Sequence, residues 1–178
     1  MGVGTNALGY ANQKIDKKVI NSIKNSNMST LNSTYEITLA EKLISIHNWA
    51  DKVRFTRSGG EANAVAIRLA RAFTKKDNIA ICGYHGWHDW YLSSNLSNQK
   101  NLDKHLLKDL NILGVPKKLK GTVFPFKYND FSALKKLIKN KKIGTIKMEV
   151  VRNVLPKNNF LKKVRNLANK KKIILIFD

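Results

Sequence analysis

The tripeptide Ser58-Gly59-Gly60 is the first part of the sequence whose residue types suggest a binding site. It separates a short apolar run at 53–56, which predicts a strand, from an amphipathic stretch at 61–73, which predicts a helix. Glycines let the backbone approach a ligand closely, and the N–H groups of a first helical turn bind anions. The spacing matches neither G-x-x-x-x-G-K-[ST] nor G-x-G-x-x-G. We interpret the tripeptide as a phosphate site or, equally, as a tight turn in which Ser58 caps the helix.

A cluster of aromatic and imidazole side chains follows a second predicted strand at 79–82. Its members are Tyr84, His85, Trp87, His88, Trp90 and Tyr91. Such side chains can stack on a planar cofactor ring. His85, His88 and Asp89 could instead bind zinc, but no second ligand pair follows at metal spacing, and Cys82 is the single cysteine. A third interpretation is an aromatic patch of the core beneath a loop.

Carboxylates stand at the ends of two further predicted strands. Asp178 follows five apolar residues, so it is expected at the rim of a buried strand, where an unpaired carboxylate is costly. A protonated heterocyclic nitrogen is a suitable partner, as in enzymes that use pyridoxal 5′-phosphate (PLP). Asp178 could also be a helix cap or a charged chain end. Glu149 ends another strand and Asn153 follows it, and each is either a ligand contact or an ordinary loop hydrogen bonder.

The pattern around these residues predicts alternating strands and helices. Helices are expected at 14–24, at 61–73, at 131–138 behind Asp130, at 160–168 and after a capping box of Ser33 and Glu36; strands are expected at 53–56, 79–82, 122–126, 143–149 and 173–177. Near-continuous apolar strands between helices predict a three-layer α/β domain with a doubly wound, mostly parallel sheet, here incomplete. Segment 92–120 is expected to be irregular. Such sheets bind ligands at the carboxyl ends of their strands, where the candidate residues lie.

Composition excludes several classes of protein. The 178 residues are 43% hydrophobic and 25% charged, which is typical of globular domains, and no apolar run approaches the roughly 20 residues of a membrane span. The net charge of +21 comes from 33 Lys and Arg against 12 Asp and Glu. Because most of the excess is lysine on predicted outer helix faces, we interpret it as a solvated surface rather than a nucleic-acid site. One cysteine and no secretory signal favour a cytoplasmic location.

Five stretches together resemble the class III aminotransferases of PLP fold type I, and within them the glutamate-1-semialdehyde aminomutase-like branch. They are GTNALGYAN at 4–12, VRFTRSGGEANAVAIRLARAFT at 53–74, CGYHGWHDWY at 82–91, KMEVVRNVLP at 147–156 and ILIFD at 174–178. The resemblance implies that Ser58-Gly59-Gly60 binds the phosphate of PLP and that Tyr84 covers the ring. It implies that His85 lies near the ring, that Glu149 belongs to the loop beside the cofactor, and that Asp178 pairs with the ring nitrogen.

The sequence departs from the pattern of this family at two places. Val150 follows Glu149 where the family usually has proline, and Val154 stands where a polar residue is usual, so Asn153 has no assigned role. In the family, the lysine that binds the cofactor covalently comes after the strand-terminal aspartate. The resemblance therefore implies a fragment without that lysine, with a helical segment at 1–52 and part of the PLP-binding large domain at 53–178. Segment 92–120 corresponds to one that gates substrate access in the aminomutases.

The resemblance also implies a function. It predicts an enzyme that moves an amino group on a small amino-aldehyde or keto substrate, as a homodimer with its site at the subunit interface. The sequence leaves the aminomutase and aminotransferase reactions open, and the carbonyl acceptor could be a sugar or a surface-polysaccharide precursor. The alternatives from other classes are a non-catalytic remnant and a basic nucleic-acid-binding domain, whose affinity would fall steeply with salt.

Overall fold

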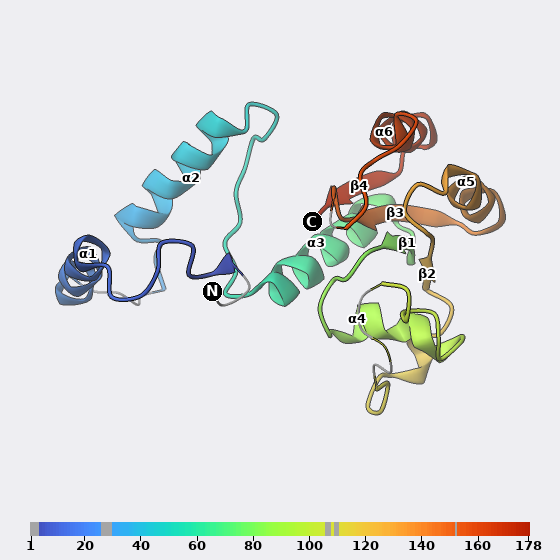
Figure 1. The fold of residues 1–178 in the computed structure, drawn as a ribbon, viewed down its shortest axis with the longest axis horizontal. Coiled ribbons are helices and arrows are strands. Elements are labelled where there is room, and N and C mark those ends of the chain that lie inside the picture. The colour runs from blue at the N-terminus through green and yellow to red at the C-terminus, as the bar shows by residue number, and fades with distance from the viewer. Residues whose placement is uncertain (1–3, 26–29, 106–107, 109–110, 152) are drawn as a thin grey trace. The chain divides into compact units, whose positions relative to one another are not determined.

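Figure 1 shows the computed structural model, which describes residues 4–25, 30–105, 108, 111–151 and 153–178. Four residues of segment 92–120, and Arg152 in the stretch 147–156, lie outside these ranges. The chain divides into two compact units, Met1–Phe55 and Thr56–Asp178. Every candidate site residue named above belongs to the second unit.

The first unit contains two helices, α1 (Gln13–Lys24) and α2 (Thr34–Ile46). The capping box predicted for α2 is confirmed, because Ser33 Oγ accepts from Glu36 N–H at 3.3 Å and the Glu36 carboxylate accepts from Ser33 N–H at 2.6 Å. The apolar stripe of α1, which includes Ile15, Val19 and Ile23, is exposed. None of the helices described in either unit is long and apolar enough to cross a membrane.

The second unit is built on a four-stranded parallel sheet, so the predicted α/β class is confirmed. Its strands are β1 (Asn78–Cys82), β2 (Val123–Pro125), β3 (Ile143–Met148) and β4 (Ile174–Phe177), in the spatial order β2-β1-β3-β4. The chain adds β2 on one side of β1 and then crosses to β3 on the other side. The point between β1 and β3 is therefore a topological switch point, where ligands of such sheets bind.

Helices cover both faces of this sheet, as Figure 1 shows. On one face, α5 (Phe131–Asn140) and α6 (Phe160–Lys171) bury a core that includes Ile146, Met148 and Phe160. On the other face, α3 (Gly59–Thr74) and α4 (Asp89–Leu92) bury a second core that includes Ile67 and Ile81. The sheet thus forms the middle of three layers, and its central strands β1 and β3 are almost wholly buried.

Two segments of the chain contain less regular structure than the sheet and its helices. The strand predicted at 53–56 was wrong, because residues 52–56 have no regular secondary structure and none of the four strands pairs with them. An apolar run becomes a strand only when a neighbour supplies hydrogen bonds, and periodicity does not reveal that neighbour. The described part of segment 92–120 has no strand, and its two short 3-10 helices are η2 (Ser93–Leu96) and η3 (Lys117–Leu119).

Candidate functional site

The tripeptide Ser58-Gly59-Gly60 forms the start of α3, with Ser58 as the N-cap and Gly59 as the first helical residue. Ser58 Oγ accepts from the backbone N–H of Glu61 at 3.2 Å, and the Glu61 carboxylate accepts from the N–H of Arg57 at 2.8 Å. The capping interpretation of Ser58 is therefore confirmed. It does not exclude an anion site, because the first N–H groups of a helix have no partner within that helix and carry its positive dipole end.

The aromatic loop after β1 approaches this helix start closely. A Cβ atom at Gly60 would lie 2.8 Å from His88 Nε2, so a larger residue at position 60 would displace the imidazole. Gly86 of the same loop is also close, because a Cβ atom at Gly86 would lie 3.6 Å from Gly60 Cα. The loop after β1 thus approaches Gly60 closely, which places His88 beside the first turn of α3.

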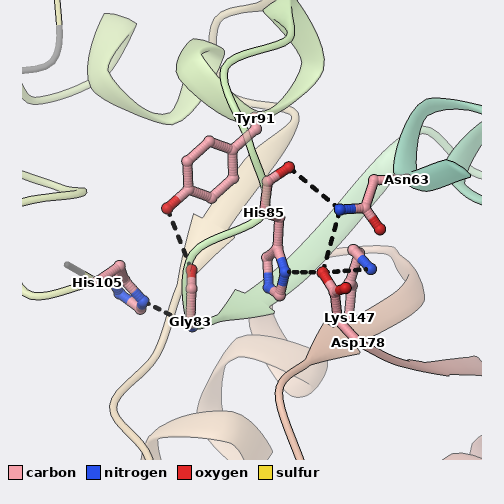
Figure 2. A network of polar contacts seen from close by, with 7 residues as sticks. All are labelled: Asn63, Gly83, His85, Tyr91, His105, Lys147 and Asp178. Atoms are coloured by element: carbon pink, nitrogen blue, oxygen red, sulfur yellow. Dashed lines mark hydrogen bonds and ion pairs between the residues drawn. The ribbon is translucent and has the colours of Figure 1, made fainter. Parts of the chain in front are cut away.

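Asp178, directly after β4, is the centre of a network of polar contacts (Figure 2). Its Oδ2 atom accepts from His85 Nδ1 at 2.7 Å, and the same atom lies 3.1 Å from both Asn63 Nδ2 and Lys147 Nζ. The Asn63 side chain also donates to the backbone carbonyl of His85 at 3.3 Å. The network therefore joins α3, the loop after β1, β3 and the end of β4 at one edge of the sheet.

The Asp178 carboxyl group is ionised at neutral pH. Its partial burial by itself would raise the pKa, but the hydrogen bond from His85 and the positive charge of Lys147 together hold the pKa well below its usual range. An ionised carboxylate can only accept hydrogen bonds, so His85 must donate from Nδ1. About one third of the Asp178 side chain is exposed, which leaves the carboxylate accessible to a ligand.

His85 is buried against aromatic rings. Its ring centroid lies 6.4 Å from that of Trp90 in a stacked arrangement and 5.7 Å from that of Tyr91 in an edge contact. The Nε2 atom is buried and has no hydrogen-bond partner among the described residues. Tyr84 is half-buried and meets Tyr91 edge-on at 6.0 Å. The core interpretation of the aromatic cluster thus holds for Trp90, which is 6% exposed, and not for Trp87, which is 71% exposed.

Glu149 lies at the switch point itself, against Gly83. Gly83 has a φ of +114°, and a Cβ atom there would overlap the Glu149 carboxylate. The Gly83 N–H donates to His105 Nδ1 at 2.9 Å, and burial together with His85 lowers the pKa of His105 to about 4. His105 is therefore a neutral imidazole at pH 7. Gly83, His105 and Glu149 border a pocket of about 330 Å³. The other residues that line this pocket are Cys82, Lys104, Lys127, Tyr128, Asn153 and Val154.

A zinc site has no counterpart in the described ranges, where no group of three or more His, Cys, Asp and Glu side chains could hold a metal ion. His85 instead faces Asp178, and His88 faces Gly60.

Three residues of the candidate site were not predicted from the sequence. Asn63 could have been suspected, because it lies one helical turn after Gly59 and shares its face of α3. Lys147 carried a clearer signal, as a lysine inside an apolar strand. His105 lies in a segment without periodicity, and nothing in the sequence marked it.

The sequence of this chain is similar to those of several known proteins. A model of the family described as aminotransferase class-III matches residues 1–178. Glutamate-1-semialdehyde 2,1-aminomutase of Sulfurisphaera tokodaii is 34% identical over 187 residues, which cover 100% of this chain and 43% of that protein. The 3-aminobutyryl-CoA aminotransferase of Cloacimonas acidaminovorans is 33% identical over 96% of this chain and 39% of its own length. The chain thus spans about two fifths of the length of these relatives.

A solved structure shares the fold. The omega-transaminase from Sphaerobacter thermophilus superposes with a TM-score of 0.81 and 27% sequence identity, over 96% of this chain and 41% of that one. The fold expected from the five sequence stretches is therefore confirmed, as is the expectation that the chain corresponds to only part of such proteins.

Proposed function

The chain belongs to the class III aminotransferases, and from that premise we propose that its second unit forms the phosphate- and ring-nitrogen-binding part of a PLP site. The whole protein is proposed to move an amino group on a small amino-aldehyde or keto substrate, as an aminomutase or an aminotransferase. The observation that carries this proposal is an ionised carboxylate, Asp178, joined through Asn63 to the helix that begins at Gly59.

The residues present fit PLP in type and spacing. Ser58, Gly59 and Gly60 offer a hydroxyl group and first-turn N–H groups to a phosphate. Asn63 lies four residues after Gly59, which is about 6 Å along a helix, and its side chain contacts Asp178. One small molecule with a phosphate group at one end and a ring nitrogen at the other would therefore contact both the start of α3 and the carboxylate.

Each residue then has a defined task in binding. Asp178 is proposed to accept a hydrogen bond from the protonated ring nitrogen, while His85 and Asn63 donate to its Oδ2 atom and fix its orientation. Tyr84 is proposed to cover one face of the ring. When bound, PLP supplies an electron sink that stabilises negative charge on the substrate carbon. Glu149, against Gly83 at the switch point, is proposed to lie beside the cofactor.

Replacement of Ser58 with aspartate tests the phosphate site. Aspartate caps helices as well as serine does, so the free energy of unfolding should stay within about 0.5 kcal/mol of the wild type. Its carboxylate should nevertheless repel a phosphate and weaken binding of pyridoxamine 5′-phosphate by about a hundredfold or more. The measurement is calorimetric titration, with enough salt to screen the exposed lysines.

Ser58→Ala is the matched control for this experiment. This substitution removes the helix cap without adding charge. It should lower the free energy of unfolding by about 1 kcal/mol and reduce the affinity for pyridoxamine 5′-phosphate far less than aspartate does. Unchanged affinity in the aspartate variant would show that the phosphate does not bind at α3.

We also propose that the protein is a homodimer located in the cytoplasm. The exposed apolar stripe of α1, with Ile15, Val19 and Ile23 between 41% and 55% exposed, supports the dimer because such a stripe needs a covering surface. Sedimentation equilibrium of the chain measures this directly. A strictly monomeric chain at micromolar concentration would count against a dimer built by this part of the protein.

A further inference from the structure

Lys147 is a buried cation in the middle of the sheet. It lies in β3, where the ladder pairs it with Ile81 of β1 and Ile176 of β4, so its flanking residues on that face are apolar. Its side chain is only 1% exposed. Lysine is almost never buried to this degree without a partner, and here the partner is Asp178 Oδ2 at 3.1 Å.

The contacts of Asp178 show that this lysine is not needed to satisfy the carboxylate. His85 and Asn63 already donate to Oδ2, and neither requires a positive charge to do so. Figure 2 shows the three donors converging on the same oxygen from different elements. Lys147 therefore adds a full positive charge to the group that is proposed to bind a protonated ring.

We propose that Lys147 is a positioning residue whose ammonium group competes with the cofactor's ring nitrogen for the Asp178 carboxylate, so that it tunes how readily the bound ring keeps its proton. This inference rests on the proposed function. The Lys147 ammonium group is a second cation at the ring-nitrogen end of the site. We therefore expect the bound ring to lose its proton at a lower pH than in a site with Asp178 but without Lys147.

The charges around Lys147 support this role. Burial lowers the pKa of Lys147, whereas Asp178 and Glu149 act to raise it, and the net direction is downward. The groups that act on the ammonium are thus Asp178 at the end of β4 and Glu149 after β3. The loop after β1 contributes His85 on the shared oxygen, and α3 contributes the uncharged Asn63. Two cations on one carboxylate repel each other, which disfavours protonation of both.

The test follows the proton on the ligand itself. Pyridoxamine 5′-phosphate labelled with ¹⁵N in the ring is bound to the chain, and the ¹⁵N chemical shift is followed against pH. In Lys147→Met the ring nitrogen should titrate at a pH higher by about one unit than in the wild type. Lys147→Arg, which keeps the charge, should titrate close to the wild type. Lys162→Met, which removes an exposed lysine on α6, should leave the titration unchanged.

The outcomes separate this inference from the proposed function. Equal titration in Lys147→Met and the wild type, with normal binding, overturns the competition and leaves the PLP site standing. Absence of binding by the wild type overturns both. If the methionine variant does not fold, Lys147→Gln provides the same comparison, because it keeps a hydrogen-bond donor toward Asp178 and removes the charge.

Discussion

Replacing Asp178 with asparagine is expected to lower the free energy of unfolding by about 2 to 3 kcal/mol at pH 7. The substitution leaves the Lys147 ammonium buried without its counter-ion, and removal of one partner of a buried pair typically costs somewhat more than this. We expect a smaller cost than for a fully buried pair because the Asp178 side chain is one third exposed, so water stabilises part of the charge left on Lys147. Urea denaturation of the two proteins gives the difference.

The same comparison has a characteristic pH dependence. The folded-state pKa of Asp178 lies below its unfolded value near 4, so its stabilising contribution is present above about pH 4 and is lost as the pH falls through the folded value. The folded-state pKa of Lys147 is lowered, and in the variant it falls further without the carboxylate. At a pH between the folded-state and unfolded-state pKa values of this lysine, the folded variant has lost the lysine proton and the unfolded chain still holds it. The free energy of unfolding of the variant therefore rises with pH, until the lysine of the unfolded chain also loses its proton near pH 10.

The stability difference between wild type and variant should thus be largest between about pH 5 and pH 8 and should narrow on both sides. Binding of pyridoxamine 5′-phosphate should weaken about ten- to a hundredfold, the loss of one charge-assisted hydrogen bond. If the difference in the free energy of unfolding between wild type and variant does not vary with pH, the ion pair of Lys147 and Asp178 is not formed in solution.

Replacing Phe160 with alanine is expected to cost about 3 to 5 kcal/mol. Phe160 begins α6, is 2% exposed, and meets the ring of Tyr128 edge-on with centroids 5.1 Å apart. The Tyr128 hydroxyl in turn donates to the carbonyl of Val150, in the loop just after Glu149. The cavity should therefore also loosen the loop at the switch point.

Phe73→Ala is the matched control, because Phe73 is 80% exposed and its removal should cost less than about 0.5 kcal/mol. Chemical denaturation midpoints of both variants provide the measurement. A loss below about 1 kcal/mol for Phe160→Ala would show that α6 is not docked on the sheet through this residue.

The sequence predicted the elements whose signals are local. Ser33, Ser58 and Asp130 each cap the helix that follows, because capping involves atoms three residues apart, which a sequence displays directly. The alternation of apolar strands with helices was enough to predict the fold class and the sheet edge at which His85 and Asp178 meet. The roles given to these residues toward a cofactor remain predictions.

What the sequence did not predict depends on distant partners. Asn63 and Asp178 are 115 positions apart, and no spacing rule connects them. The run 53–56 has the composition of a strand but no strand neighbour in the sheet. Lys147 was overlooked because its meaning depends on the carboxylate that β4 brings alongside β3, which is a property of the ladder rather than of β3 itself.

Cys82, the single cysteine of the chain, makes the opening of the sheet directly measurable. It ends β1 and is 4% exposed, and burial together with Glu149 raises the pKa of its thiol to about 12. In the folded protein it is therefore neutral and shielded, whereas in an opened chain it has an ordinary thiol pKa near 8.5 and reacts with alkylating reagents. Under native conditions, the alkylation rate reports the free energy for exposing the central strand, without any engineered probe.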